Sequence, residues 1–193
     1  ANTTPEKFVK TTGNPIAGTT MRYRLDDAQH RNSNTIVETA LNYNTNAPDQ
    51  ACVAALTAAI TETSIYIYAN NQVQASMNYR HDKVASEQDY VGLFQYPASR
   101  FRDIGADMDP AKATQIFLYQ MVRIRGWQNM DPGVLAQQVQ RRGTAARYQQ
   151  WVSAARNLCQ FGEGDNGGNS GGYNGGNNGG YNGGYNGGNN YNY

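Results

Sequence analysis

Apolar residues recur every three to four positions through most of residues 34–160, which is the spacing of one buried helix face. The pattern predicts helices at residues 34–43, from Pro48, after Asp109-Pro110, after Asp131-Pro132 and after Thr144. Aspartate followed by proline is typical of a helix start, because aspartate caps free backbone N–H groups and proline fits the first turn. The helix from Pro48 is unusually apolar, so we expect it to be the most buried helix.

The segments around these helices have other patterns. Residues 65–105 interleave Tyr and Ile with polar residues and predict a small hairpin or long loops. Residues 1–25 carry little periodicity and predict an irregular N-terminal arm. From residue 162 onward, glycine pairs recur every four residues without any aliphatic side chain, so this segment cannot bury enough apolar surface to offset its conformational entropy. The sequence therefore predicts one mostly α-helical domain at residues 26–161, followed by a disordered tail at 162–193.

The charge balance argues against a nucleic-acid binder. The 193 residues include 16 Lys and Arg and 15 Asp and Glu, a formal net charge of +1. Without Glu163 and Asp165, the rest of the chain is mildly basic, which suits an anionic polymer such as a bacterial wall. It is far from the basic stripe expected of a nucleic-acid protein. No apolar run approaches the ~18 residues of a membrane span, so we expect no membrane contact.

Cys52 and Cys159 are the only cysteines, and His30 and His81 the only histidines, at positions far apart in the chain. This set is too small and too scattered for a zinc motif, so we expect no metal and no cofactor. The cysteines form either one disulfide or two buried thiols, and we expect the disulfide. A disulfide favours an oxidising compartment. Together with a start at Ala1 without methionine, it predicts a mature secreted protein.

Glu62 is the strongest candidate for chemistry. It lies near the end of the most apolar helix, where the pattern requires an apolar or edge position. A buried carboxyl group tends to keep its proton near neutral pH, as a general acid must. The alternative is a helix-end glutamate in solvent. Hydroxyl groups at 61, 63 and 64 and the rings of Tyr66 and Tyr68 nearby favour a sugar-binding site.

Glycoside cleavage often uses a second carboxylate. Asp82, Glu87 and Asp89 all precede the segment Gly92-Leu93-Phe94-Gln95, whose glycine permits a tight turn. Asp89 is closest to that turn and is the leading candidate, with Asp82 as the reserve. Each of these acids could instead be an ordinary solvated loop charge.

The stretch from Ala28 to Cys159 resembles the secreted lysozyme-like domains of actinobacteria and their phages, relatives of soluble lytic transglycosylases and goose-type lysozymes. The matching pieces occur in the family's order: Ala-Ile-Thr-Glu-Thr-Ser at 59–64, Asp-Tyr-Val-Gly-Leu-Phe-Gln at 89–95, Asp-Pro at 109–110 with Phe-Leu at 117–118, and Gly-Trp-Gln at 126–128 with Ala-Gln-Gln-Val-Gln at 136–140. Secreted fungal muramidases are also similar. This resemblance implies a lysozyme-like fold.

The resemblance also implies residue roles. Glu62 would donate a proton to the leaving glycosidic oxygen in peptidoglycan, at the β-1,4 bond between N-acetylmuramic acid and N-acetylglucosamine. The substrate-binding residues would be Gln95, Tyr96, Tyr90, Tyr148 and Gln140. Lytic transglycosylase chemistry, non-catalytic binding of wall glycan, and self-association through the repetitive tail are the alternatives. We expect a monomer whose partner is the glycan strand.

Two further sets of side chains have two interpretations each. Trp127 and Trp151 could be sugar platforms, but their helical spacing favours the core. Arg141, Arg142 and Arg147 could meet carboxylates of the peptide stems, but a solvated helix face is the expected role.

Overall fold

The computed structural model describes residues 25–161, of which only the backbone is described at Phe161. The predicted arm at 1–25, apart from residue 25, and the predicted tail at 162–193 lie outside the described residues. The described chain is mostly helical, as predicted. In this part of the chain, no helix is both long enough and apolar enough to cross a membrane.

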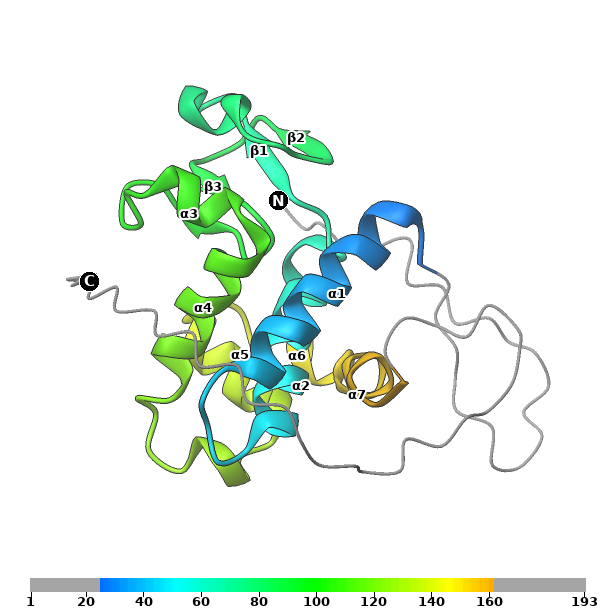
Figure 1. The fold of residues 1–193 in the computed structure, drawn as a ribbon. Helices are drawn as coiled ribbons and strands as arrows, with labels where there is room; N and C mark the ends of the chain where they lie inside the picture. The colour runs from blue at the N-terminus through cyan, green and yellow to red at the C-terminus, as the bar shows by residue number, and fades with distance from the viewer. Residues whose placement is uncertain (1–24, 162–193) are drawn as a thin grey trace.

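Helix α2 (Pro48–Thr63) is the centre of the core. Every residue from Ala51 to Thr63 is buried, as the apolar sequence predicts. Five other helices pack against α2: α1 (Asp27–Asn42), α4 (Pro110–Met121), α5 (Pro132–Gln140), α6 (Ala145–Gln149) and α7 (Val152–Phe161). Figure 1 shows these helices around α2. Its five buried alanines have small side chains, so its neighbours can approach it closely.

The two Asp-Pro helix starts are confirmed. The Asp109 side chain accepts a hydrogen bond from the backbone N–H of Lys112 at 2.8 Å, and α4 begins at the next residue, Pro110. Asp131 accepts from the N–H groups of Gly133 and Val134 at 2.9 and 3.0 Å at the start of α5. In both cases the aspartate satisfies N–H groups that the first helical turn leaves without a partner.

The first predicted helix is longer than expected. Helix α1 begins at Asp27 rather than Asn34, because Asp26 and Gln29 form a reciprocal capping box. Its first turns bury polar side chains: Gln29 donates to the carbonyl oxygen of Ser64, and Asn32 to that of Ile65, each at 2.9 Å. These buried polar residues interrupt the apolar spacing, so the pattern did not indicate a helix there.

Two further differences lie later in the chain. The short helix α3 (Ile104–Met108) was not predicted. The helix predicted after Thr144 is divided into α6 and α7, and the backbone N–H of Trp151 bonds to the carbonyl oxygen of Tyr148 at the break. Trp127 is buried in the core, as its spacing predicted, in the 3-10 helix η2 (Trp127–Asn129).

The segment between α2 and α3 forms the β region of the molecule. Strand β1 (Tyr68–Asn70) pairs in parallel with β2 (Lys83–Ala85), and the 3-10 helix η1 (Gln74–Asn78) lies between them in sequence. Strand β3 (Tyr90–Val91) pairs with β4 (Tyr96–Pro97) as a tight antiparallel hairpin. The hairpin matches one of the two predicted alternatives, whereas the parallel pair was not expected. Figure 1 shows β1, β2, β3 and α3 together at one end of the helical body.

The predicted disulfide is confirmed. Cys52 in α2 and Cys159 in α7 are bonded, with their Cα atoms 6.1 Å apart. The two cysteines are 107 positions apart in sequence, so the bond links the first part of the core to the last helix. A crosslink that closes a loop of this length contributes about 4–5 kcal/mol in the loop-entropy picture.

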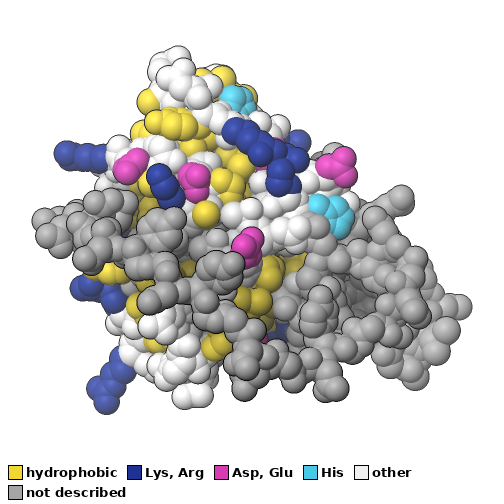
Figure 2. Space-filling model, viewed as in Figure 1, with side chains coloured by type: hydrophobic (Ala, Val, Ile, Leu, Met, Phe, Trp, Pro, Cys, Tyr) yellow, Lys and Arg dark blue, Asp and Glu magenta, His cyan; other side chains and the backbone are white. Residues whose placement is uncertain are grey.

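Basic side chains on the face drawn in Figure 2 lie singly or in small groups, separated by other residues. Among the described residues of this face there is no continuous basic stripe of the kind that follows a nucleic-acid backbone.

Candidate functional site

Glu62 lies in the last turn of α2, at the junction of the helical body and the β region. The helix ends at Ser64, which adopts the left-handed conformation with φ 54°, and Ile65 follows with φ 64°. The two hydrogen bonds from α1 to the carbonyl oxygens of Ser64 and Ile65 hold this turn in place. Glu62 is only 5% exposed, so the prediction that it is buried is confirmed.

Three side chains from the last part of the chain surround the Glu62 carboxylate. Arg142 Nη2 lies 2.9 Å from Oε2, and Arg147 Nη1 lies 3.7 Å from Oε1. The phenol of Tyr148 also donates a hydrogen bond to Oε1. A buried charge is costly unless it is paired and hydrogen-bonded, and these groups meet that requirement. The predicted solvated face is therefore wrong for Arg142 and Arg147.

The Gly92–Gln95 segment lies beside the carboxylate. Thr63 Oγ1 donates to the carbonyl oxygen of Leu93 at 2.8 Å, which joins the end of α2 to this segment. The carbonyl oxygen of Phe94 accepts from Gln140 Nε2 at 2.7 Å and from Arg142 Nη2 at 2.8 Å. Arg142 therefore links Glu62 to the segment that the sequence singled out.

Gly92 permits this close approach. Its φ is +79°, in the left-handed region, and a Cβ atom at this position would overlap the backbone carbonyl oxygen of Asp107 in α3. Only glycine meets both conditions without strain. The tight turn predicted at Gly92 is confirmed.

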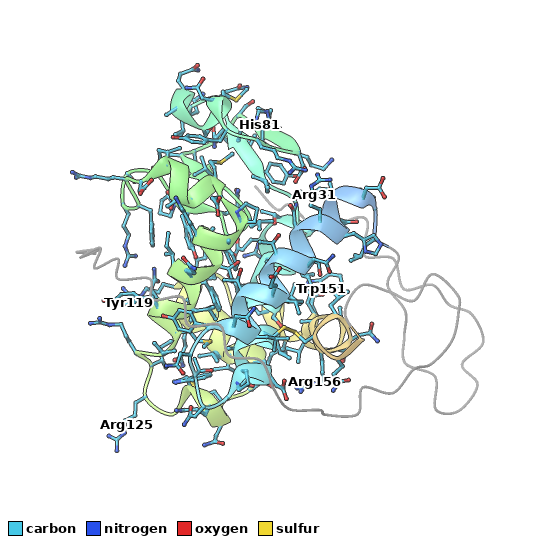
Figure 3. The ribbon with its side chains drawn as sticks, in the orientation of Figure 1. Arg31, His81, Tyr119, Arg125, Trp151 and Arg156 are labelled. Atoms are coloured by element: carbon cyan, nitrogen blue, oxygen red, sulfur yellow. A yellow bond between two sulfur atoms is a disulfide. The ribbon has the colours of Figure 1, made fainter. Side chains whose placement is uncertain are left out.

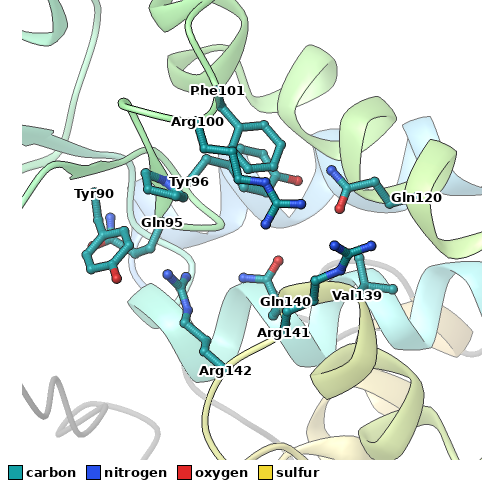
Figure 4. Close-up of a pocket in the computed structure, with 11 residues that line it drawn as sticks. Tyr90, Gln95, Tyr96, Arg100, Phe101, Gln120, Val139, Gln140, Arg141 and Arg142 are labelled. Carbon is teal, nitrogen blue, oxygen red and sulfur yellow. The ribbon is translucent and has the colours of Figure 1, made fainter. Parts of the chain in front are cut away.

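Two adjoining pockets form the candidate site. The Glu62 pocket has a volume of about 480 Å³, and its lining includes Glu62, Glu87, Tyr68 and Arg147. The second pocket, which we call the Arg100 pocket, has a volume of about 150 Å³. Tyr90, Gln95 and Arg142 line both, so the two pockets adjoin, and we call them together the groove. Figure 4 shows the Arg100 pocket and the side chains that line it.

The structure brings four of the five predicted substrate-binding residues to this groove. Tyr90 and Gln95 line both pockets, and Tyr96 and Gln140 line the Arg100 pocket. Tyr148 is fully buried at 0% exposure, so the prediction that it contacts sugar is wrong. Its hydroxyl group faces Glu62 instead.

The predicted second carboxylates are placed elsewhere. Asp82 accepts from the backbone N–H of Ile67 at 2.9 Å and from Asn32 Nδ2 at 2.8 Å. Asp89 accepts from the backbone N–H of Ser99 at 2.8 Å, which closes the β3–β4 hairpin. Neither is among the residues that line the Glu62 pocket. Glu87 is the other acid that lines it.

Sequence analysis missed the partners of Glu62. Arg142 and Arg147 lie about eighty residues away in sequence, and the spacing between them and Glu62 carries no local signal. Glu87 was one of three loop acids, and the sequence analysis ranked Asp89 and Asp82 above it because Asp89 is closest to the turn at Gly92. The approach of the β2–β3 loop, which carries Glu87, to the end of α2 decides which acid faces the pocket.

The surroundings of the carboxylate affect the neighbouring side chains. Burial and the adjacent Glu62 raise the pKa of the Tyr148 phenol, so this group stays protonated and remains a donor throughout the physiological range. Burial lowers the pKa of the Arg142 guanidinium, but Glu62, Tyr148 and Tyr90 together raise it, and the net direction is upward. Arg142 therefore stays charged.

The fold and the site together define a mostly helical protein that holds a buried, ion-paired glutamate at the wall of a polar groove. No group of three or more His, Cys, Asp or Glu side chains within residues 25–161 is arranged to hold a metal ion. No protein-family model matches the sequence, and no curated protein matches it. The resemblance to lysozyme-like domains therefore stays a prediction that depends on the motifs themselves.

Proposed function

We propose that this protein is a secreted muramidase with a lysozyme-like fold. It cleaves the β-1,4 bond between N-acetylmuramic acid and N-acetylglucosamine, with Glu62 as the proton donor. The observation that carries the proposal is the position of Glu62, buried on the last turn of α2 and lining the same pocket as Gln95. The disulfide supports an oxidising, extracellular location.

Proton donation requires a rearrangement at Arg142. In the protein without glycan, Glu62 is in an ion pair with Arg142, and an ionised carboxylate has no proton to give. Arg142 Nη2 has a second acceptor in the carbonyl oxygen of Phe94, at 2.8 Å. When glycan enters the groove, Arg142 keeps this second bond and releases Glu62, and Arg147 moves away from Oε1. Glu62 then takes up a proton from the solvent before water is excluded, and donates this proton to the glycosidic oxygen.

Glu87 is the best-placed second carboxylate, because it lines the Glu62 pocket and Asp82 and Asp89 do not. It is exposed on the β2–β3 loop, so it can reach a water molecule on the far side of a bound sugar. In this role Glu87 activates the water that completes hydrolysis.

The test is Glu62→Gln, which keeps the shape of the side chain and removes its acid. We expect the rate of turbidity loss on purified cell walls to fall by about 10²-fold or more. Glu38→Gln, at an exposed position on α1, is the matched control and should keep full activity. If Glu62→Gln clears cell walls as fast as the wild type, Glu62 is not the proton donor.

Two observations favour alternatives. Both carboxylate oxygens of Glu62 are paired, which favours a protein of the same fold that binds wall glycan without cleaving it. Such a protein would be retained on walls and release no muropeptides, and Glu62→Gln would be retained equally.

The displacement of Asp82 and Asp89 from the pocket favours a lytic transglycosylase, which needs no water-activating base. Mass spectrometry would then find anhydro-muropeptides, each lighter than the hydrolysis product by one water.

A further inference from the structure

The Arg100 pocket has an unusual charge distribution. Three of its lining residues are arginines, Arg100, Arg141 and Arg142, and no acidic side chain among the described residues lines it. The amides of Gln120 and Gln140 line it as well. Figure 4 shows the three guanidinium groups and the two amides pointing toward one common space, although they come from three different parts of the chain.

Two of the three guanidinium groups have no ion-pair partner among residues 25–161. Arg142 pairs with Glu62. By contrast, neither Arg100 nor Arg141 forms an ion pair or donates a side-chain hydrogen bond to the residues that the structure describes, and the Arg100 guanidinium lies 5.5 Å from the centre of the Phe101 ring. Like charges that converge on one pocket repel each other, and a bound anion would relieve that repulsion.

The backbone holds Arg141 in an uncommon conformation. It is the residue that ends α5, with φ 55° and ψ 34°, in the left-handed region. Gly or Asn fits this conformation at lower cost than arginine, for which it costs about 1 kcal/mol or more. Arginine at this position directs a guanidinium group into the pocket despite that cost, which is consistent with a role in binding.

The chemistry of the pocket indicates a carboxylate ligand. The guanidinium fork matches the two oxygens of a carboxylate, and about 150 Å³ accommodates such a group with a few attached atoms. The amide of Gln120 adds a donor and an acceptor of the kind that pairs with a peptide bond. The ligand that fits is therefore a peptide segment that carries a carboxylate.

We propose that Arg100 and Arg141 form a carboxylate subsite for the peptide stem of the wall glycan. This inference rests on the proposed function and adds a preference for glycan strands that carry stems. Tyr90, Gln95 and Arg142 connect this subsite to the Glu62 pocket, so a stem attached to a sugar beside Glu62 lies within its reach.

The test compares three substrates with the full-length protein. They are solubilised glycan strands with peptide stems, the same strands after an amidase has removed the stems, and a neutral chitooligosaccharide. The stripped strands keep the lactyl carboxylate of N-acetylmuramic acid, and the chitooligosaccharide has no carboxylate. The variant is Arg100→Gln with Arg141→Asn, because asparagine tolerates the left-handed conformation.

We expect the double variant to raise KM about tenfold or more for strands with stems, with kcat unchanged, because two charge-assisted bonds are lost. KM for stripped strands and for the chitooligosaccharide should not change. Arg125→Gln is the matched control, since Arg125 is exposed and Figure 3 shows it at the periphery of the molecule. An equal rise in KM for stripped strands would overturn the stem assignment in favour of the lactyl carboxylate. An unchanged KM for all three substrates would overturn the subsite itself.

A binding measurement separates this inference from the proposed function. Calorimetry with the free peptide L-alanyl-γ-D-glutamate and the Glu62→Gln protein needs no cleavage. Binding that is lost in the same protein with Arg100→Gln and Arg141→Asn supports the subsite even if the walls release no muropeptides. Absence of peptide binding in the Glu62→Gln protein contradicts the subsite, whatever the enzyme does to glycan.

Discussion

Asp107 is a buried acid that should make the stability of this protein depend on pH. Its side chain, in α3, is 1% exposed, and neither carboxylate oxygen has a hydrogen-bond partner within residues 25–161. Burial and, to a smaller extent, the negative charge of Asp103 raise the pKa of Asp107 from 3.8 to about 8. Burial disfavours the charged form of a carboxyl group, so the folded protein keeps this proton.

The direction of the effect follows from proton binding. In the unfolded chain Asp107 ionises near its ordinary pKa of 3.8, whereas in the folded protein it holds its proton up to about pH 8. Between these values the folded state binds more protons, so the free energy of unfolding falls as pH rises. Each pH unit costs about 1.4 kcal/mol, so the loss between about pH 4 and 7 is about 4 kcal/mol.

Asp107→Asn removes the titrating group and keeps its shape. We expect the variant to match the wild type near pH 4 and to be more stable by about 4 kcal/mol near pH 7. Urea unfolding followed by circular dichroism, at intervals between about pH 4 and 9, gives the difference in unfolding free energy at each pH.

The control is Asp103→Asn. Asparagine still caps α3, where Asp103 accepts from the backbone N–H of Ala106 at 3.0 Å, but it removes the neighbouring charge. Asp103→Asn should lower the pKa of Asp107 in the folded protein. The free energy of unfolding of this variant should therefore stop falling at a lower pH than that of the wild type. A difference between Asp107→Asn and wild type that does not vary with pH would refute the reasoning.

The remaining predictions concern the packing around the site. Gly92→Ala should destabilise the protein by about 3 kcal/mol, because its Cβ would overlap the carbonyl oxygen of Asp107 at a positive φ. Gly126→Ala, also at positive φ but with open space around it, should cost only about 1 kcal/mol in the same urea titration, and equal losses would contradict the role of the overlap. Tyr148→Phe should cost about 1–3 kcal/mol, because it removes a donor from buried Glu62. An unchanged urea midpoint for Tyr148→Phe would show that another donor replaces the Tyr148 hydroxyl group at Glu62.

Much of the helical framework was predictable because the signals for it are local. The Asp-Pro pairs at 109–110 and 131–132 mark helix starts through contacts within one turn, and the apolar run after Pro48 identified the central helix. The Cys52–Cys159 bond was expected from the cysteine count, although no local feature places the two residues side by side. The start of α1 was missed because its polar residues are buried against distant carbonyl groups.

The candidate site was likewise predictable only where its signals are local in sequence. By itself, the sequence identified Glu62 as a buried acid, because helix periodicity reports burial, and the resemblance to lysozyme-like domains implied that Gln95 lies near it. Only the tertiary structure decided that Glu62 is paired with Arg142 and that Glu87, rather than Asp89, faces its pocket. Those choices depend on how loops distant in sequence approach one another, and a short side chain in a loop bonds to whichever backbone N–H group the packing brings within reach.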